Sequence, residues 1–337
     1  MTTGLLIILF LVLILPFAIK AVERRLEWFL LVMGAAAALV SGVWGRELLG
    51  RALSDPLLIT AAVLIAGLLF RMFTRQIDGS VRWLQRIMPE RLLYALIVMV
   101  LGLVSSMITA IIAALVLVTV VAALRLGRRS EIRLVILACY SIGLGAALTP
   151  IGEPLSTITV KKLSADFSFL FHLIGLDVLT AILLFGMLAA VWVDPPLERV
   201  AVSGGEKARE TVFSVLGRAF NVYVFVMALT LLGAGFEPLI REHLTDVAPG
   251  TLYWINMLSA VLDNATLAAA EISPLMQYDA IRAILLGLLI SGGMLIPGNI
   301  PNIIAAGKLR ITSVEWAKFG VPVGLVALVV YYFIGIR

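Results

Sequence analysis

Acidic side chains inside long apolar stretches are the residues of this sequence best suited to chemistry. Glu153 lies in the proline- and glycine-rich stretch 149–154, and Asp263, followed by Asn264, lies in the middle of the apolar stretch 252–276. An acid at the centre of a membrane helix costs about 2.5–3.5 kcal/mol, so one that is present there is a candidate for function. Two carboxylates in one dry site disfavour each other's charge, which allows a proton to be exchanged for a metal cation. We therefore expect Glu153, Asp263 and Asn264 to bind Na⁺ or Li⁺ and protons in turn.

Neutral oxygen donors accompany these acids and complete the predicted site. Side-chain oxygens, together with backbone carbonyls freed at prolines, are the hard ligands that ions of the size of Na⁺ prefer. The further predicted ligands of the cation and the proton are Thr149, Asn299 and Asn302. The predicted supporting residues are Ser105, Ser106, Thr109 and Asp177. A broken helix also needs polar side chains to satisfy its own backbone, so the Asn and Ser residues have a structural alternative.

Each acid has a structural alternative as well. Glu153 would cap a half-helix that begins at Pro154, where an acid interacts favourably with the helix dipole. Asp263 would hold the tip of a hairpin by hydrogen bonds. Asp177 is either a proton relay or an acid bonded to a neighbouring helix, and Glu271, two turns after Asp263, is expected at a solvated helix end.

The composition identifies the environment of these residues. Of 337 residues, 61% are hydrophobic and 14% are charged, and the mean hydropathy is +1.08. Globular soluble chains carry about 25% charged residues, so this composition excludes a soluble enzyme, a secreted disulfide-rich protein and a nucleic-acid-binding protein. The sequence contains no phosphate-binding loop or cofactor motif, so we expect neither an enzyme nor a bound cofactor. Transport driven by an ion gradient is the remaining prediction.

The apolar stretches predict an all-α membrane protein with about eight full spans. Six plain stretches are long enough or nearly long enough to cross a bilayer, at residues 5–19, 30–43, 57–70, 167–193, 219–236 and 314–336. Four others are interrupted. The stretches 92–126 and 252–276 contain polar residues at their centres and predict two re-entrant hairpins. The stretches 134–163 and 281–309 contain proline and glycine, and predict two broken transmembrane helices.

The loop charges decide between hairpins and full crossings, because Lys and Arg collect on the cytoplasmic side. With two hairpins and an outside N-terminus, 19 of the 26 basic residues are cytoplasmic, whereas two crossings give almost no bias. The hairpins then enter from opposite sides, which predicts an inverted repeat. Matches of Leu103 with Leu258, and of the proline pair at 150 and 154 with the pair at 297 and 301, support the repeat. The predicted divisions are scaffold spans at 1–91, a first repeat at 92–193, a cytoplasmic linker at 194–217 and a second repeat at 218–337.

Three short motifs resemble NhaD-type sodium/proton antiporters of the ion transporter superfamily. The stretch 145–159, GAALTPIGEPLSTIT, resembles their first broken helix, 259–264, SAVLDN, their second hairpin tip, and 292–299, GGMLIPGN, their second broken helix. The resemblance implies a homodimer with scaffold and transport domains that move like an elevator. It also implies that the acids of the site are Glu153 and Asp263. The sequence departs from the family in having Glu at position 153, where Asp is usual, and in being shorter.

The predicted function is therefore Na⁺ (or Li⁺)/H⁺ antiport in a prokaryotic plasma membrane, with the bilayer and a second copy of the chain as partners. A sodium-coupled symporter of an organic or inorganic anion is the alternative, because half-helix N-termini can face an anion. The absence of Arg and Lys from the centre of the proposed site counts against this alternative. A channel or a membrane scaffold that transports nothing is the third possibility.

Overall fold

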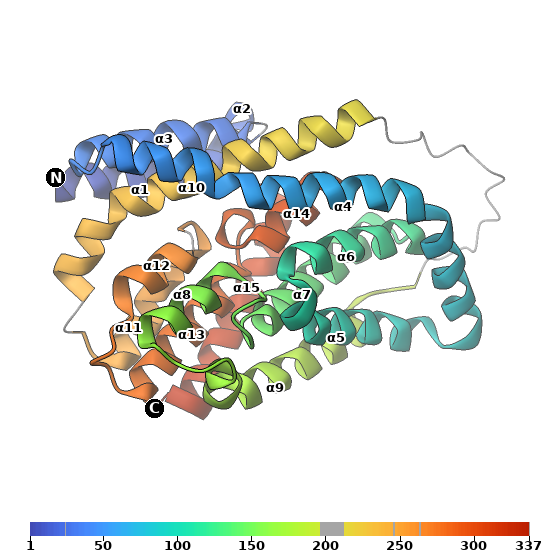
Figure 1. The fold of residues 1–337 in the computed structure, drawn as a ribbon. Coiled ribbons are helices and arrows are strands. Elements are labelled where there is room, and N and C mark those ends of the chain that lie inside the picture. The colour runs from blue at the N-terminus through green and yellow to red at the C-terminus, as the bar shows by residue number, and fades with distance from the viewer. Residues whose placement is uncertain (24, 196–211, 245–246, 263, 337) are drawn as a thin grey trace.

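A computed structural model describes residues 1–337 except 24, 196–211, 245–246, 263 and 337. The described residues form helices and contain no strand, which confirms the predicted all-α class (Figure 1). The helices of the first 193 residues are α1 (Thr2–Ala18), α2 (Lys20–Glu23), α3 (Leu26–Val40), α4 (Arg46–Ile87), α5 (Glu90–Ile108), α6 (Ala110–Leu124), α7 (Arg128–Ala146), α8 (Pro154–Leu163) and α9 (Phe169–Trp192). The later helices are α10 (Val212–Leu244), α11 (Pro249–Ile255), η1 (Asn256–Ala260), α12 (Asn264–Glu271), α13 (Tyr278–Gly292), η2 (Ile296–Gly298), α14 (Ile300–Leu309), α15 (Ser313–Tyr331) and η3 (Tyr332–Ile336).

Four of the described helices are long and apolar enough to cross a membrane. They cover Glu90–Ile108, Phe169–Trp192, Ala219–Leu239 and Ser313–Ile334. Three of the four coincide with predicted plain spans. The predicted spans at 5–19 and 30–43 form the shorter apolar helices α1 and α3. The chain is therefore an all-α membrane protein.

The first predicted hairpin differs from expectation in the length of its arms. Ser105 and Ser106 do not interrupt α5, because their hydroxyls donate to the carbonyls of Gly102 and Leu103 one turn earlier, at 2.7 and 2.8 Å. The chain turns only at Thr109, whose φ of 74° lies in the left-handed region. As a result α5 has 19 residues, and α6 has 15. By length and composition α5 could cross a bilayer by itself.

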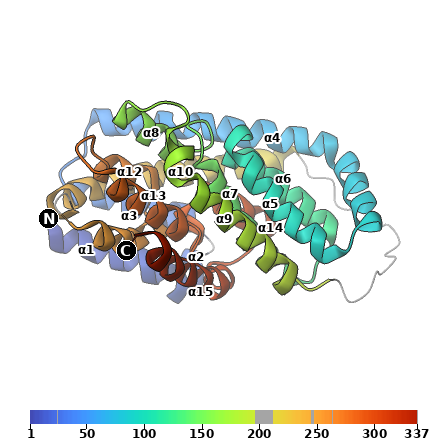
Figure 2. The ribbon, with the colours of Figure 1, turned by 90° about the horizontal axis from the view of Figure 1, so that it is seen from below.

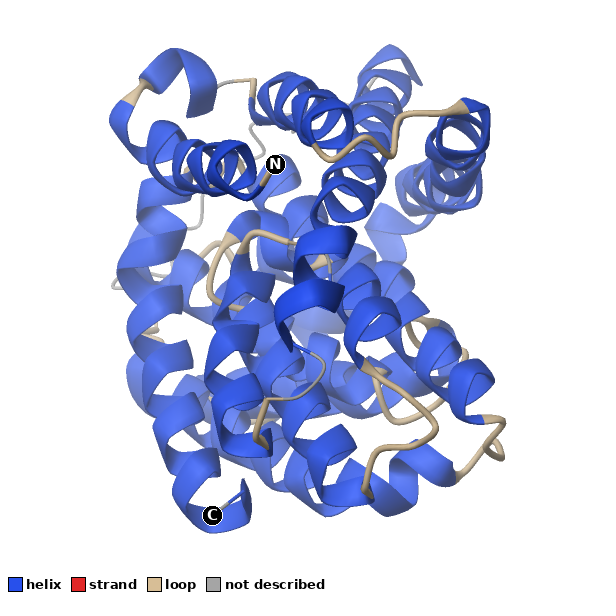
Figure 3. Cartoon of the chain, turned by 90° about the vertical axis from the view of Figure 1, so that its left-hand side faces the viewer, coloured by secondary structure: helices blue, strands red, loops and turns tan. Residues whose placement is uncertain are grey.

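The helices form a layer and a bundle (Figures 1 and 3). Helices α1, α3, α4 and α10 lie over the other helices, and α10 packs along both α3 and α4. Gly34 of α3 and Gly235 of α10 lie directly against the backbone of the partner helix, so small residues allow the close approach that is typical of membrane helices. The predicted scaffold at 1–91 therefore packs against a helix that the sequence assigned to the second repeat.

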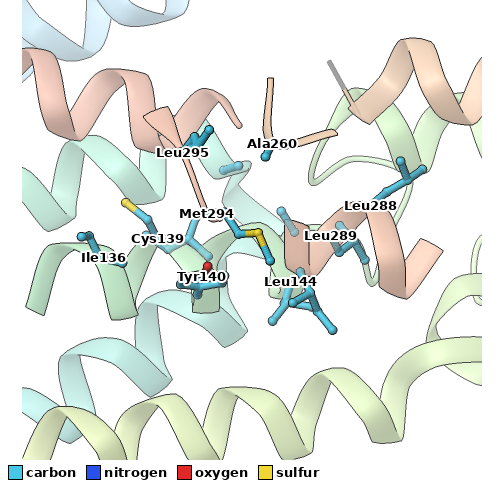
Figure 4. Packing of buried hydrophobic residues seen from close by; sticks show 14 of the residues in the cluster. Ile136, Cys139, Tyr140, Leu144, Ala260, Leu288, Leu289, Met294 and Leu295 are labelled. Carbon is cyan, nitrogen blue, oxygen red and sulfur yellow. The ribbon is translucent and has the colours of Figure 1, made fainter. Parts of the chain in front are cut away.

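Helices α7 and α13 form the centre of the bundle and are almost completely buried. The Tyr140 ring of α7 lies against Gly293 at the end of α13, and its hydroxyl donates to the carbonyl of Gly320 in α15 at 2.7 Å. Figure 4 shows Tyr140 beside Met294 and Leu144 in this apolar core. The two helices that the sequence predicts to be broken thus both end in the middle of the molecule.

Polar contacts gather several loops at one end of the bundle. Arg128, the first residue of α7, donates to Glu315 at the start of α15 and to the carbonyls of Leu309 and Arg310 after α14. Arg133 of α7 donates to the carbonyl of Trp192, the last residue of α9. The two chain ends are both on the left-hand side in Figures 1 and 2, but Figure 1 shows the N-terminus beside the upper layer and the C-terminus at the bottom of the bundle. The starts of α7 and α15 and the ends of α9 and α14 therefore share one end of the bundle.

Close packing of α5 on α7 gives a test of the fold. A Cβ at Gly145 would clash with the carbonyl of Gly102, so Gly145→Ala should push the two helices apart. Overpacking of this kind costs about 1–3 kcal/mol, and we expect a lower thermal unfolding midpoint in detergent, followed by circular dichroism. Gly127→Ala is the matched control, because nothing lies within 4 Å of its Cβ position. Equal midpoints for the two variants would contradict this packing.

Candidate ion-binding site

The first broken helix places Glu153 at the start of a half-helix. Helix α7 ends at Ala146, and α8 begins at Pro154. Glu153 is the N-cap residue, with the extended backbone angles φ −155° and ψ 160°, and proline is favoured at the first helical position that follows. The Glu153 side chain is buried, with 8% of the residue exposed. An acid therefore lies at a helix N-terminus within the bundle, as both interpretations require, but its side chain forms no capping hydrogen bond with α8.

The second broken helix repeats this arrangement with an amide. Helix α13 ends at Gly292, and α14 begins at Ile300 after the short turn η2. Asn299 is the N-cap residue, with φ −153° and ψ 147°. Its side-chain amide lies against Gly143, so the second break contacts α7 of the first half. The predicted ligand Asn299 therefore occupies the same kind of position as Glu153.

Five backbone hydrogen bonds fix how the two breaks correspond. In the first break the amide donors and carbonyl acceptors are Ala147 to Leu144, Leu148 to Gly145, Gly152 to Thr149, Thr157 to Glu153, and Ala165 to Val160. Each of these bonds has an equivalent in the second break, between residues whose numbers are higher by 146. This offset pairs Glu153 with Asn299. The proline pairs suggest an offset larger by one residue. The sequence comparison was therefore wrong by one position in this region.

Equivalent serine hydroxyls form hydrogen bonds between each hairpin and the neighbouring broken helix. Ser105 donates to the carbonyl of Ile142 in α7, and Ser259 donates to the carbonyl of Leu288 in α13, both at 3.0 Å. The first residues of the second arms, Ala110 in α6 and Asn264 in α12, keep the same offset as the two serines. Sequence matching of Leu103 with Leu258 is therefore also shifted by one residue.

The first hairpin tip is bonded to the first break. The Thr149 hydroxyl donates to the carbonyl of Ser106, and the amide of Ala110 donates to the carbonyl of Gly152 at 3.0 Å. Thr109 caps α6 through its hydroxyl, which accepts from the amide of Ile112. The predicted residues Thr149, Ser106 and Thr109 therefore lie together and stabilise the backbone of this turn.

Two amide side chains meet at the second break around Gly292. Asn302 donates from Nδ2 to the carbonyls of Gly292 and Leu295, at 2.8 and 2.9 Å. The Asn264 amide lies against the Cα of Gly292 and is buried. Neither polar atom of Asn264, nor Oδ1 of Asn302, has a hydrogen-bond partner among the described residues. These three buried polar atoms are available to a ligand.

The other predicted site residues have different outcomes. Asp263 lies outside the described residues, between Leu262 and the start of α12. Asp177 forms a two-point ion pair with Arg282, at 2.8 and 2.9 Å, and its backbone carbonyl accepts from the hydroxyl of Tyr331. This pairing agrees with the alternative of an acid bonded to a neighbouring helix.

Glu271 corrects the expectation of a solvated helix end, because only 4% of the residue is exposed. Its helix α12 packs against α8, α10 and α13, which cover its end. Two further buried polar residues, Asn256 and Ser291, were not singled out from the sequence. A sequence signal exists for Glu271, which directly follows the apolar run 267–270.

Corresponding polar residues in the two breaks allow a matched test of backbone satisfaction. Asn302 donates two hydrogen bonds, whereas Ser156, its counterpart, donates one, to the carbonyl of Ala147. A buried group left unsatisfied costs about 1–3 kcal/mol, so Asn302→Ala should lower the free energy of unfolding more than Ser156→Ala. Denaturant unfolding of both purified variants in detergent measures the difference. A cost for Ser156→Ala equal to that for Asn302→Ala would show that the second carbonyl bond contributes nothing.

Comparison with known families gives one match. The family described as a protein of unknown function, DUF1646, matches residues 2–336, almost the whole chain. No curated protein matches the sequence. The chain therefore belongs to the DUF1646 family.

Proposed function

We propose that this protein is a secondary active transporter that exchanges Na⁺ (or Li⁺) for H⁺. Its site contains Glu153, Asp263 and Asn264, with Thr149, and with Asn299 and Asn302 from the second break. The observation that carries the proposal is the pair of helices that end inside an apolar bundle, with a buried acid at the start of α8 and, at the second break, the Asn264 amide and the Asn302 Oδ1 atom, which have no hydrogen-bond partner among the described residues. Irregular backbone at membrane depth is typical of transporters, where it lines an ion path.

The proposed transporter is built from an inverted repeat. The recurring hydrogen bonds of the two breaks support the repeat. Helix contacts support the repeat too. Helix α6 packs against α14 in the same way that α12 packs against α8. Exchanging the halves a second time, α4 packs against α6 in the same way that α10 packs against α12. This second exchange extends the repeat to include α4 and α10. The common end shared by the loops at 125–127, 193–195 and 310–312 supports their lying on one side of the membrane, and the count of basic residues is the reason to propose that this side is cytoplasmic and the N-terminus outside.

The proposed chemistry follows from the surroundings of Glu153. Burial disfavours a charged carboxylate, whereas the N-terminus of α8 favours it. A bound cation or a bound proton each relieves the cost of burial. In the proposed mechanism the carboxylate binds one of them at a time. Each exchange of one for the other therefore couples the two gradients. Amide and hydroxyl oxygens next to the carboxylates complete the coordination of a hard cation.

Reconstitution of the full chain into proteoliposomes tests the exchange. Na⁺ added outside vesicles that contain a pH-sensitive dye should enter as protons leave, so the lumen should become alkaline with no organic anion present. Glu153→Gln and Asp263→Asn should each abolish this response, because a neutral amide cannot alternate between the two ions. Asp55→Asn, at an exposed acid of α4, is the control that should leave it unchanged.

The same vesicles separate the alternatives. A response that requires an added carboxylate or oxyanion would replace antiport by sodium-coupled anion symport. A Na⁺ current without any pH change in the lumen would instead identify a channel. Either result would contradict the proposed exchange.

A further inference from the structure

We propose a second binding site, for a hard monovalent cation of the Na⁺ class, formed by Glu271, Asn256 and Ser291 inside the second hairpin. Glu271 is the last residue of α12, Asn256 the first of η1, and Ser291 lies near the end of α13. Helices η1 and α12 are in the arms of the second hairpin, and α13 packs against both. The site differs from the proposed exchange site, because Glu271 lies about two turns along α12 from Asn264.

The three side chains are buried and have uncommitted polar atoms. At most 4% of each residue is exposed. Both carboxylate oxygens of Glu271, both amide atoms of Asn256 and the hydroxyl of Ser291 have no hydrogen-bond partner among the described residues. A buried polar group without a partner costs about 1–3 kcal/mol, and a buried charge costs more. A bound ligand would satisfy these five atoms.

Packing brings together the elements that contain the three residues, because α13 packs against both η1 and α12. The Asn256 amide lies beside the Glu271 carboxylate, although no pair of their atoms has hydrogen-bond geometry. The Cβ of Asn256 also packs at the Cα of Gly287 in α13. Ser291 follows Gly287 by four residues and therefore lies on the same face of α13. Arms η1 and α12 and helix α13 thus supply one ligand each.

The first half of the chain shows that the fold itself does not need these polar groups. By the offsets of the hydrogen-bonded serines and of the two breaks, Asn256 corresponds to Gly102 and Ser291 to Gly145. Glu271 corresponds to Leu117, which is fully buried in the apolar core. The same backbone arrangement is therefore built from two glycines and a leucine in one half and from three polar side chains in the other.

The chemistry of the three groups selects the ligand. Together they offer four side-chain oxygens: two from the carboxylate, one from the amide and one from the hydroxyl. Oxygen ligands of this kind suit hard cations, and one carboxylate balances one positive charge. Among the described residues Glu271 takes part in no ion pair, so none of the described Lys and Arg side chains supplies that balance.

Equilibrium binding of radioactive Na⁺ to the purified full chain in detergent tests the second site. In the double variant Glu153→Gln, Asp263→Asn, which removes the acids of the exchange site, we expect one Na⁺ per chain to remain bound. Adding Glu271→Gln should abolish this binding. Absence of binding in the double variant, or binding unaffected by Glu271→Gln, would overturn the inference and leave the proposed exchange to be judged by the vesicle experiment.

A milder variant and a second measurement guard against misfolding. Ser291→Gly restores the residue type of the corresponding position in the first half and should weaken Na⁺ affinity by about 10- to 100-fold. Na⁺ should also raise the thermal unfolding midpoint of the double variant, since ligands that bind only the folded state stabilise it. Asp279→Asn, at an exposed acid of α13, should change neither quantity. An unchanged Na⁺ affinity in Ser291→Gly would exclude its hydroxyl as a ligand and so contradict the site as proposed.

Discussion

A helix that stops inside an apolar bundle frees backbone groups that water cannot reach, and each must find a partner in the protein. Leaving such a group unsatisfied in an apolar medium costs several kcal/mol. Asn302 satisfies the carbonyls of Gly292 and Leu295, and Ser156 satisfies that of Ala147. These bonds fix the path of both breaks. The positions of Glu153 and Asn299, at the starts of the two half-helices, follow from that path.

The two halves have the same backbone arrangement at their breaks but different side chains around it. Ser156 and Gly102 of the first half correspond to the amides Asn302 and Asn256 of the second. Amides have both a donor and an acceptor, so an amide that donates to the backbone still offers an oxygen. At this pair of positions the Asn302 Oδ1 atom has no partner among the described residues, whereas the Ser156 hydroxyl donates to its own backbone. In the proposed transporter this difference between halves, rather than the shared architecture, would determine ion specificity.

Much of this arrangement was predictable from the sequence, but its register was not. Proline and glycine density located both breaks, and the apolar stretches located the long helices. Proline spacing failed because Pro154 is the first residue of α8 whereas Pro301 is the second of α14. Amides in the first helical turn have no intrahelical partner, so proline is tolerated at either position. The burial of Glu271 depends on packing of α12 against other helices, and the sequence pattern around Glu271 does not predict which helices pack there.

The charge at the half-helix starts bears on the choice between a cation and an anion as cargo. A helix N-terminus carries partial positive charge, which attracts anions. At α8 the Glu153 carboxyl already lies at that position, so an anionic substrate would compete with a fixed acid. At α14 the residue is the neutral Asn299, whose amide is packed against Gly143. Both N-cap residues thus have polar side chains, one of them acidic, although neither forms a capping hydrogen bond with its half-helix. An arrangement of this kind favours a ligand that neutralises an acid, which a cation or a proton does and an anion does not.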